Sequence, residues 1–103
     1  MARVAATQSA VDDEAAILAD LGDTAGYRLA AKYKALFDRL YGLLAAHPAI
    51  GSRRPSLGPR VRIWVVAPYV VIYELSERED TVMVLRIVHG RRDITRTLLG
   101  SDP

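Results

Sequence analysis

Hydrophobic residues recur at spacings of three and four in the first half of the chain, a pattern typical of a helix with one apolar face. This face consists of Leu29, Tyr33, Leu36, Phe37, Leu40, Leu43, Leu44 and His47. Asp23 or Thr24 can cap the start of the helix, and Pro48 ends it because proline disfavours helical geometry at the residue before it. The pattern predicts a long helix that needs a second apolar surface to cover its stripe.

A shorter helix is predicted upstream of this one. The run Ser9-Ala10-Val11-Asp12 has the capping-box spacing of a helix start, and Asp12, Asp13 and Glu14 then lie where the helix dipole favours negative charge. We therefore interpret this acidic triplet as helix-start chemistry rather than as a metal site. The helix runs through Ile17, Leu18 and Leu21 and stops near Gly22, so the two helices should form an αα-hairpin.

The second half of the chain predicts strands. Residues 50–59 are dense in turn formers and should form a loop, and the segments 61–66, 69–75 and 81–88 are rich in β-branched and aromatic residues. Their short turns, Ala67-Pro68 and residues 76–80, imply an antiparallel meander. In the last strand, strict alternation puts Val82, Val84, Arg86 and Val88 on one face and Met83, Leu85, Ile87 and His89 on the other. The middle strand is apolar on both sides, so the inward face stays open.

Residues 3–7 are short and could be an edge strand. The order of elements then predicts an α+β fold with an N-terminal strand, an αα-hairpin and a three-stranded antiparallel meander packed on the helices. With 103 residues, the chain fits one domain, 1–103.

Composition narrows the chemistry. The chain is 50% hydrophobic and 25% charged, as globular proteins are, and it has no cysteine, which removes disulfides, thiolate nucleophiles and cysteine-bound metals. With two histidines far apart in the sequence, we expect neither a metal nor a cofactor. The sequence shows no secretory leader and no apolar run long enough to cross a bilayer, so we expect a soluble, cytoplasmic protein.

Charge is distributed unevenly along the chain. The first helix region carries Asp12, Asp13, Glu14, Asp20 and Asp23, whereas the second half carries Arg53, Arg54, Arg60, Arg62, Arg86, Arg91, Arg92 and Arg96 without any lysine. Because arginine is a fork-shaped donor for phosphate and carboxylate, this half could face an anionic partner. The alternative is a solvated arginine-rich surface, and charge alone does not separate the two.

Three sequence motifs agree with this order of elements. They are Leu43-Leu44-Ala45-Ala46-His47-Pro48 followed by Ile50-Gly51, then Val61-Arg62-Ile63-Trp64-Val65 followed by Tyr69-Val70-Val71-Ile72-Tyr73, and finally Val84-Leu85-Arg86-Ile87-Val88-His89-Gly90-Arg91-Arg92-Asp93-Ile94. Together they resemble the RelE/ParE superfamily, the toxin half of type II toxin–antitoxin pairs, from about residue 3 to residue 99. The resemblance implies growth arrest, plasmid stabilisation and an antitoxin whose disordered segment folds on binding, with a groove beside the hairpin or an exposed edge strand as its site.

Two mechanisms diverge within this superfamily. RelE-like members cut mRNA on the ribosome, and the groups that could do so here are His89, Arg62, Arg86 and Arg91, with Arg92 beside them. Several features depart from those members: Val70 follows Tyr69 where an arginine is usual, residues 60–65 are not lysine-rich, and no tyrosine follows Tyr73. The resemblance is therefore to the ParE-like class, which inhibits DNA gyrase without being a hydrolase, with a non-toxic binding module as a third alternative.

Candidate residues for binding a target or an antitoxin are Arg60, Arg62, Trp64, Arg86, His89, Arg91 and Arg92. Each also has a structural interpretation. His89 could simply hydrogen-bond the turn that follows it, and Arg86, which lies among apolar strand residues, could hold a carboxylate such as Glu74 across the meander.

Overall fold

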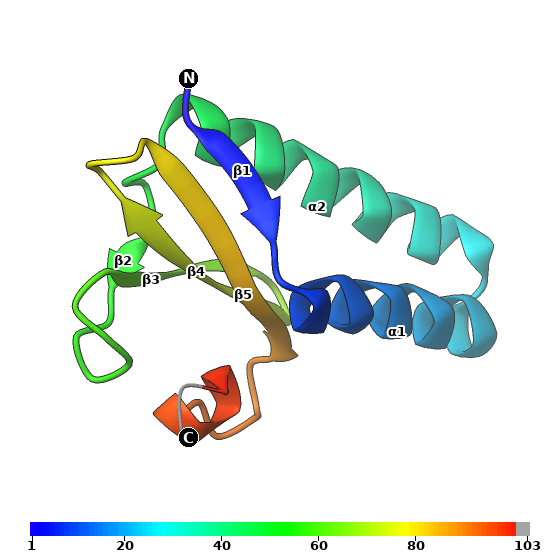
Figure 1. Ribbon diagram of the computed structural model, residues 1–103. Helices are drawn as coiled ribbons and strands as arrows, with labels where there is room; N and C mark the ends of the chain where they lie inside the picture. The colour runs from blue at the N-terminus through cyan, green and yellow to red at the C-terminus, as the bar shows by residue number, and fades with distance from the viewer. Residues whose placement is uncertain (101–103) are drawn as a thin grey trace.

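The computed structural model describes residues 1–100 and contains one five-stranded sheet with two long helices beside it (Figure 1). The elements, in order, are β1 (Arg3–Ala6), α1 (Gln8–Ala25), α2 (Tyr27–Ala46), β2 (Ser52–Arg53), β3 (Val61–Val66), β4 (Tyr69–Ser76), β5 (Thr81–His89) and the short 3-10 helix η1 (Arg96–Leu99). The strand order across the sheet is β1-β5-β4-β3-β2. The predicted α+β arrangement is therefore confirmed, and the hairpin turn between α1 and α2 projects beyond the sheet (Figure 1).

The sheet contains the expected meander and one strand that the sequence did not predict. β3, β4 and β5 pair antiparallel in succession, and β1 adds to β5 as a parallel edge strand. β2 lies in the segment predicted as a loop, where Ser52 pairs with Ile63 and Arg53 pairs with Arg62. Two residues surrounded by glycine and proline carry too little β-pattern to be recognised as a strand.

The helix boundaries differ from prediction at three points. Thr7, not Ser9, is the N-cap of α1, and its Oγ1 accepts a hydrogen bond of 3.1 Å from the Ala10 amide. α1 continues through Gly22 to Ala25, because an interior glycine costs only about 1 kcal/mol, and it ends where Gly26 adopts a φ of 93°. α2 therefore begins at Tyr27 without a side-chain cap, while its predicted end before Pro48 is confirmed.

The acidic triplet is also displaced from its predicted place. With Thr7 as N-cap, Asp12, Asp13 and Glu14 fall beyond the first turn of α1, which holds no acidic residue. Each acidic side chain instead has its own partner. Asp12 accepts a hydrogen bond from Gln8, Asp13 binds Arg86, and Glu14 accepts one from the Tyr41 hydroxyl. Asp13 and Glu14 thus connect α1 to β5 and α2, whereas Asp12 bonds within α1, and none of the three lies in the first turn of the helix.

Both faces of the sheet are buried, which explains why β4 is apolar on both sides. A helix-side core contains Phe37, Leu40, Leu44, Val71, Tyr73, Val82, Val84 and Ile87, among others. A second core on the opposite face contains Leu57, Val61, Val70, Ile72 and Val88, covered in part by Ile94, Leu98 and Leu99 from the C-terminal segment.

A β-bulge in β5 overturns the strict alternation predicted for that strand. Ile72 pairs with Arg86 and Tyr73 pairs with Val84, so Leu85 has no partner on β4 and the faces exchange there. Ile87 consequently joins Val82 and Val84 in the helix-side core, and Val88 joins the second core. Arg86 emerges on the second-core side, next to the open edge of β5.

Candidate functional site

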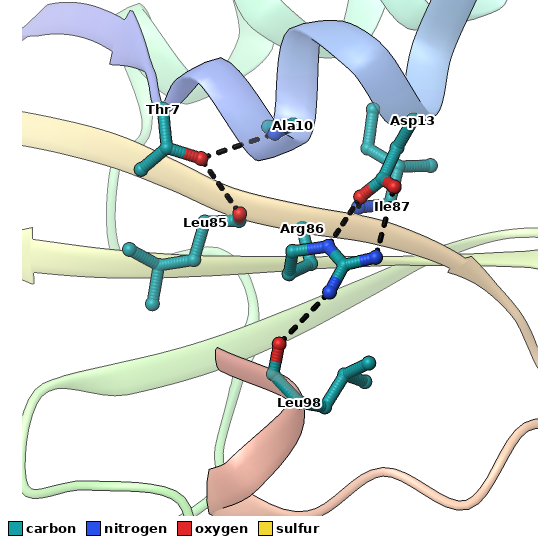
Figure 2. Close-up of polar contacts among 7 residues, drawn as sticks. All are labelled: Thr7, Ala10, Asp13, Leu85, Arg86, Ile87 and Leu98. Carbon is teal, nitrogen blue, oxygen red and sulfur yellow. Dashed lines mark hydrogen bonds and ion pairs between the residues drawn. The ribbon is translucent and has the colours of Figure 1, made fainter. Parts of the chain in front are cut away.

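The Arg86 side chain joins three segments of the chain at the edge of β5 (Figure 2). Its Nε and Nη2 donate to the two Asp13 carboxylate oxygens at 2.6 and 2.9 Å, and its Nη1 donates to the Leu98 carbonyl at 2.9 Å. The Ile87 amide also donates to Asp13 at 2.9 Å. We call Asp13, Arg86 and the Leu98 carbonyl the clasp, because together they hold α1, β5 and η1.

The clasp forms where β1 stops short. β1 pairs with β5 only as far as Val84, and the backbone of β5 beyond it would otherwise be unpaired at the edge. Thr7 supplies the first bonds, from its amide to Val84 and from its hydroxyl to the Leu85 carbonyl at 2.8 Å. Asp13 supplies the next, so the start of α1 completes the sheet edge (Figure 2).

The clasp is largely shielded from solvent. The side chains of Arg86 and Asp13 are 18% and 16% exposed, and the hydrogen bonds that Arg86 donates to Asp13 raise the pKa of its guanidinium. The partner is Asp13 rather than Glu74, which lies 4.0 Å from Arg60. A bidentate, shielded pair of this kind gives Arg86 a structural function.

His89 hydrogen-bonds the turn that follows β5. Its Nδ1 accepts from the Arg91 amide at 3.1 Å, which places the proton of the neutral ring on Nε2. Its ring packs edge-on against Tyr69 with the centroids 5.9 Å apart, and Tyr69 in turn contacts Tyr33 and Phe37. Arg91 and Arg92 are exposed in the same turn.

Arg62 supports the segment between α2 and β2. Its Nη1 donates to the carbonyls of Ala49 and Gly51 at 3.0 and 2.8 Å. The buried Tyr73 hydroxyl bonds the same segment, donating to Pro48 and accepting from the Gly51 amide, both at 2.8 Å, and burial raises the pKa of Tyr73. A Cβ on Gly51 would lie 2.6 Å from the Ile63 carbonyl and 2.7 Å from the Tyr73 hydroxyl, so this position requires glycine.

The four candidate ribonuclease groups are not gathered at one point. Arg62 pairs with Tyr73 of β4, and His89 pairs with Tyr69 of the same strand. Because Tyr69 and Tyr73 are four positions apart, Arg62 and His89 lie about 13 Å apart along the strand direction. Arg86 lies on the opposite face of the sheet from both. Arg62 and Arg86 are each engaged by groups of the fold itself.

Trp64 lies in a groove between α2 and β3. The groove has a volume of about 360 Å³ and is lined by Leu36, Arg39, Leu40, Leu43, Trp64, Val65, Val66 and Ala67. The sequence predicted a groove beside the hairpin, but not Arg39 as part of it. No acidic residue is among these lining residues.

The outer edge of β3 adjoins this groove and is partly unpaired. β2 pairs only with Arg62 and Ile63, so within residues 1–100 no strand covers the outer edge of Trp64, Val65 and Val66. Val65 is 57% exposed. Groove and edge together form one continuous surface, which we call the α2–β3 surface.

Within the described part of the chain, no three histidine, cysteine, aspartate or glutamate side chains are grouped so as to hold a metal ion. None of the described helices is long and apolar enough to cross a membrane.

The chain is similar to known proteins over most of its length. A family model described as the ParE toxin of the type II toxin–antitoxin system, parDE, matches residues 4–94. Toxin ParE3 of Caulobacter vibrioides is 29% identical over 98 residues, covering 95% of this chain and 96% of the relative.

Solved structures share the fold. A chain of the chromosomal ParDE toxin–antitoxin system from P. aeruginosa has a TM-score of 0.71 at 23% identity, covering 86% of this chain and 96% of that one. A chain of the RelBE2 toxin–antitoxin complex from Mycobacterium tuberculosis has a TM-score of 0.60 at 24% identity, covering 85% and 96%. At these identities the likeness concerns the fold alone.

Proposed function

The chain belongs to the ParE toxin family of type II toxin–antitoxin systems, and on this premise we propose that it arrests growth by binding DNA gyrase, without hydrolysing its target. The clasp is the observation that favours gyrase binding over mRNA cleavage. Arg86, one of the candidate cations for stabilising a cleaved phosphate, is held by Asp13 and by the Leu98 carbonyl, on the far side of the sheet from Arg62 and His89. An arginine whose hydrogen bonds are already made within the protein is poorly placed to stabilise the negative charge that develops on a phosphate during cleavage.

We also propose that a cognate antitoxin covers the α2–β3 surface in the cytoplasm. The groove offers aliphatic side chains from α2 beside Trp64, and the free edge of β3 offers backbone hydrogen bonds next to them. An extended or helical segment with apolar anchors would satisfy both. The two structural neighbours are described as toxin–antitoxin assemblies, which supports a partner of this kind.

The test of the toxic activity is inducible expression of the chain in a bacterium, with growth, the DNA-damage response and cleavage of a reporter mRNA measured together. We expect growth arrest with DNA damage and intact mRNA, and inhibition of supercoiling by purified gyrase when the purified chain is added.

Two variants sharpen this test. His89→Ala should remain as toxic as the unchanged chain, because His89 bonds only the turn after β5 and packs on Tyr69. Codon-periodic mRNA cleavage that disappears in His89→Ala would overturn the gyrase proposal in favour of the ribonuclease alternative. Folded, abundant protein without any growth arrest would overturn both and leave a non-toxic binding module.

A further inference from the structure

Two arginines face each other across the outermost strand pair of the sheet. Arg53 of β2 and Arg62 of β3 are directly paired in the antiparallel register, so their side chains leave the sheet on the same face. Like charges placed directly opposite each other on a sheet are destabilising. The pair therefore adds repulsion to the free chain, which an anion bound by both arginines would relieve.

Within residues 1–100, no carboxylate pairs with either arginine. The ion pairs within residues 1–100 join Lys34 to Asp38, Arg60 to Glu74 and Arg86 to Asp13, and neither Arg53 nor Arg62 takes part in one. Arg62 is nevertheless held in position, because its Nη1 is bonded to the carbonyls of Ala49 and Gly51. Its other nitrogens, and the whole exposed Arg53 guanidinium, stay available to an acceptor from outside.

The surroundings indicate what kind of molecule carries the acceptor. Arg62 and Trp64 lie two residues apart on β3 and share one face, so the arginine pair adjoins the apolar groove. A second hollow of about 260 Å³ lies on the same strand pair and is lined by Ser52, Ile63, Trp64 and Val65. Phosphate backbones need cations without an apolar groove beside them, whereas a peptide segment can present an acidic and an apolar side chain together.

We infer that Arg53 and Arg62 form a carboxylate-binding pair, which receives an aspartate or glutamate of the antitoxin segment whose apolar side chains fill the α2–β3 groove. This inference rests on the proposed antitoxin binding and adds the chemistry of the partner to it. A carboxylate shared by two guanidinium groups makes charge-assisted hydrogen bonds and removes the repulsion between them.

The experiment compares two neighbouring arginines. Arg53→Gln removes one member of the pair, and Arg54→Gln is the matched control, because the Arg54 amide continues the ladder to the Val61 carbonyl at 2.9 Å and its side chain therefore starts on the opposite face. The affinity of the purified chain for its proposed cognate antitoxin is measured at low and high salt. Arg53→Gln should weaken binding about tenfold or more and flatten the salt dependence, whereas Arg54→Gln should change affinity less than about twofold.

A second measurement separates binding from folding. Thermal unfolding of the free Arg53→Gln variant should occur at an equal or higher temperature than that of the unchanged chain, because the positive charge paired with Arg62 in the sheet register has been removed. Lower thermal stability of the free variant would overturn the inference, since it would give Arg53 a structural function.

The remaining outcomes are equally decisive. Equal effects of Arg53→Gln and Arg54→Gln, or no effect of either, would overturn the carboxylate-binding pair while leaving antitoxin binding intact. Arg53→Gln that weakens binding of a single-stranded DNA 12-mer but not of the antitoxin would assign the pair to phosphate instead and overturn the inference. An unchanged chain that does not bind the antitoxin at any salt concentration would remove the proposed partner itself.

Discussion

The two ends of the sheet use arginine in opposite ways. At the β5 edge, Arg86 is matched by a carboxylate and a carbonyl and is 18% exposed, so its charge is neutralised within the fold. At the β2 edge, Arg53 and Arg62 face each other without a carboxylate from residues 1–100. The difference teaches that the location of an arginine on a sheet says little about its use until its partners are known. Satisfied charges stabilise the free chain, whereas unsatisfied ones are available to bind.

The largest effect should come from breaking the satisfied edge. Asp13→Asn keeps the shape of the side chain but removes its charge, which leaves the Arg86 guanidinium shielded and unpaired. We expect a loss of about 3 kcal/mol in the free energy of unfolding, measured by urea denaturation. Asp12→Asn, one position earlier and bonded only to Gln8 on the surface, is the control and should change stability by less than about 0.5 kcal/mol. Equal losses in both variants would contradict the structural function assigned to the clasp.

The second-largest effect should come from the segment around Gly51, which connects α2 to β2 and so positions the strand that carries Arg53. Gly51→Ala places a methyl group against the Ile63 carbonyl and the Tyr73 hydroxyl, so that backbone or the buried tyrosine must shift. We expect about 2 kcal/mol of destabilisation by urea denaturation. Gly42→Ala is the matched control, because nothing lies within 4 Å of its added methyl on α2. That variant should gain about 0.5–1 kcal/mol through helix propensity, and a loss there would contradict the packing described.

Alkaline pH should weaken the tyrosine contacts while it spares the clasp. The pKa values of Tyr41, Tyr69 and Tyr73 are raised, chiefly by burial, and for Tyr41 also by its hydrogen bond to Glu14. Above the unfolded tyrosine pKa of 10.0, the unfolded chain releases protons that the folded chain retains, so stability falls as pH rises. Each tyrosine contributes up to about 1.4 kcal/mol per pH unit.

The measurement is the free energy of unfolding at pH 9 and pH 11 for the unchanged chain and for Tyr41→Phe. The variant should show a shallower decline, because one of the raised pKa values is gone. Tyr27→Phe is the control, since Tyr27 is 76% exposed, and it should leave the decline unchanged. Identical slopes in all three proteins would contradict the account.

The smallest effect on stability is expected for Arg60, whose ion pair with Glu74 is exposed to solvent. Arg60 lies 4.0 Å from Glu74, and the two side chains are 62% and 37% exposed. Arg60→Gln should therefore change the free energy of unfolding by no more than about 0.5 kcal/mol, and the change should vanish at high salt. A loss as large as that of Asp13→Asn would show that exposure does not separate the two kinds of ion pair.

Local pattern was enough to predict much of the fold. The strand at residues 61–66 and the end of α2 before Pro48 follow from β-branched residues and from proline, whose effects act within a few positions. The choice of Thr7 over Ser9 as N-cap did not follow, since both are good capping residues and the bond from Thr7 to the Leu85 carbonyl decides between them. The bulge at Leu85 has no sequence signal of its own, so the predicted faces of β5 exchanged at that point.

The candidate sites were less predictable for the same reason. The sequence shows that Arg86 needs a partner, but Asp13 is 73 positions away and no local pattern selects it over Glu74. Arg53 and Arg62 become neighbours only through a two-residue strand inside a predicted loop. A groove beside the helical hairpin was expected, and the structure places Trp64 among the residues that line one, opposite Leu36, Leu40 and Leu43 of α2.

The attachment of the C-terminal segment affects how deletion experiments should be interpreted. Ile94, Leu98 and Leu99 pack against the second core, and the Leu98 carbonyl completes the clasp, so η1 and the residues just before it cover part of one face of the sheet. A deletion from residue 94 onward would expose Ile72 and Val88 to water and favour aggregation and degradation. Loss of toxicity after such a deletion would then reflect a lower amount of folded protein in the cell. Target contacts in this region should instead be mapped by single substitutions at exposed positions such as Arg91 and Arg92.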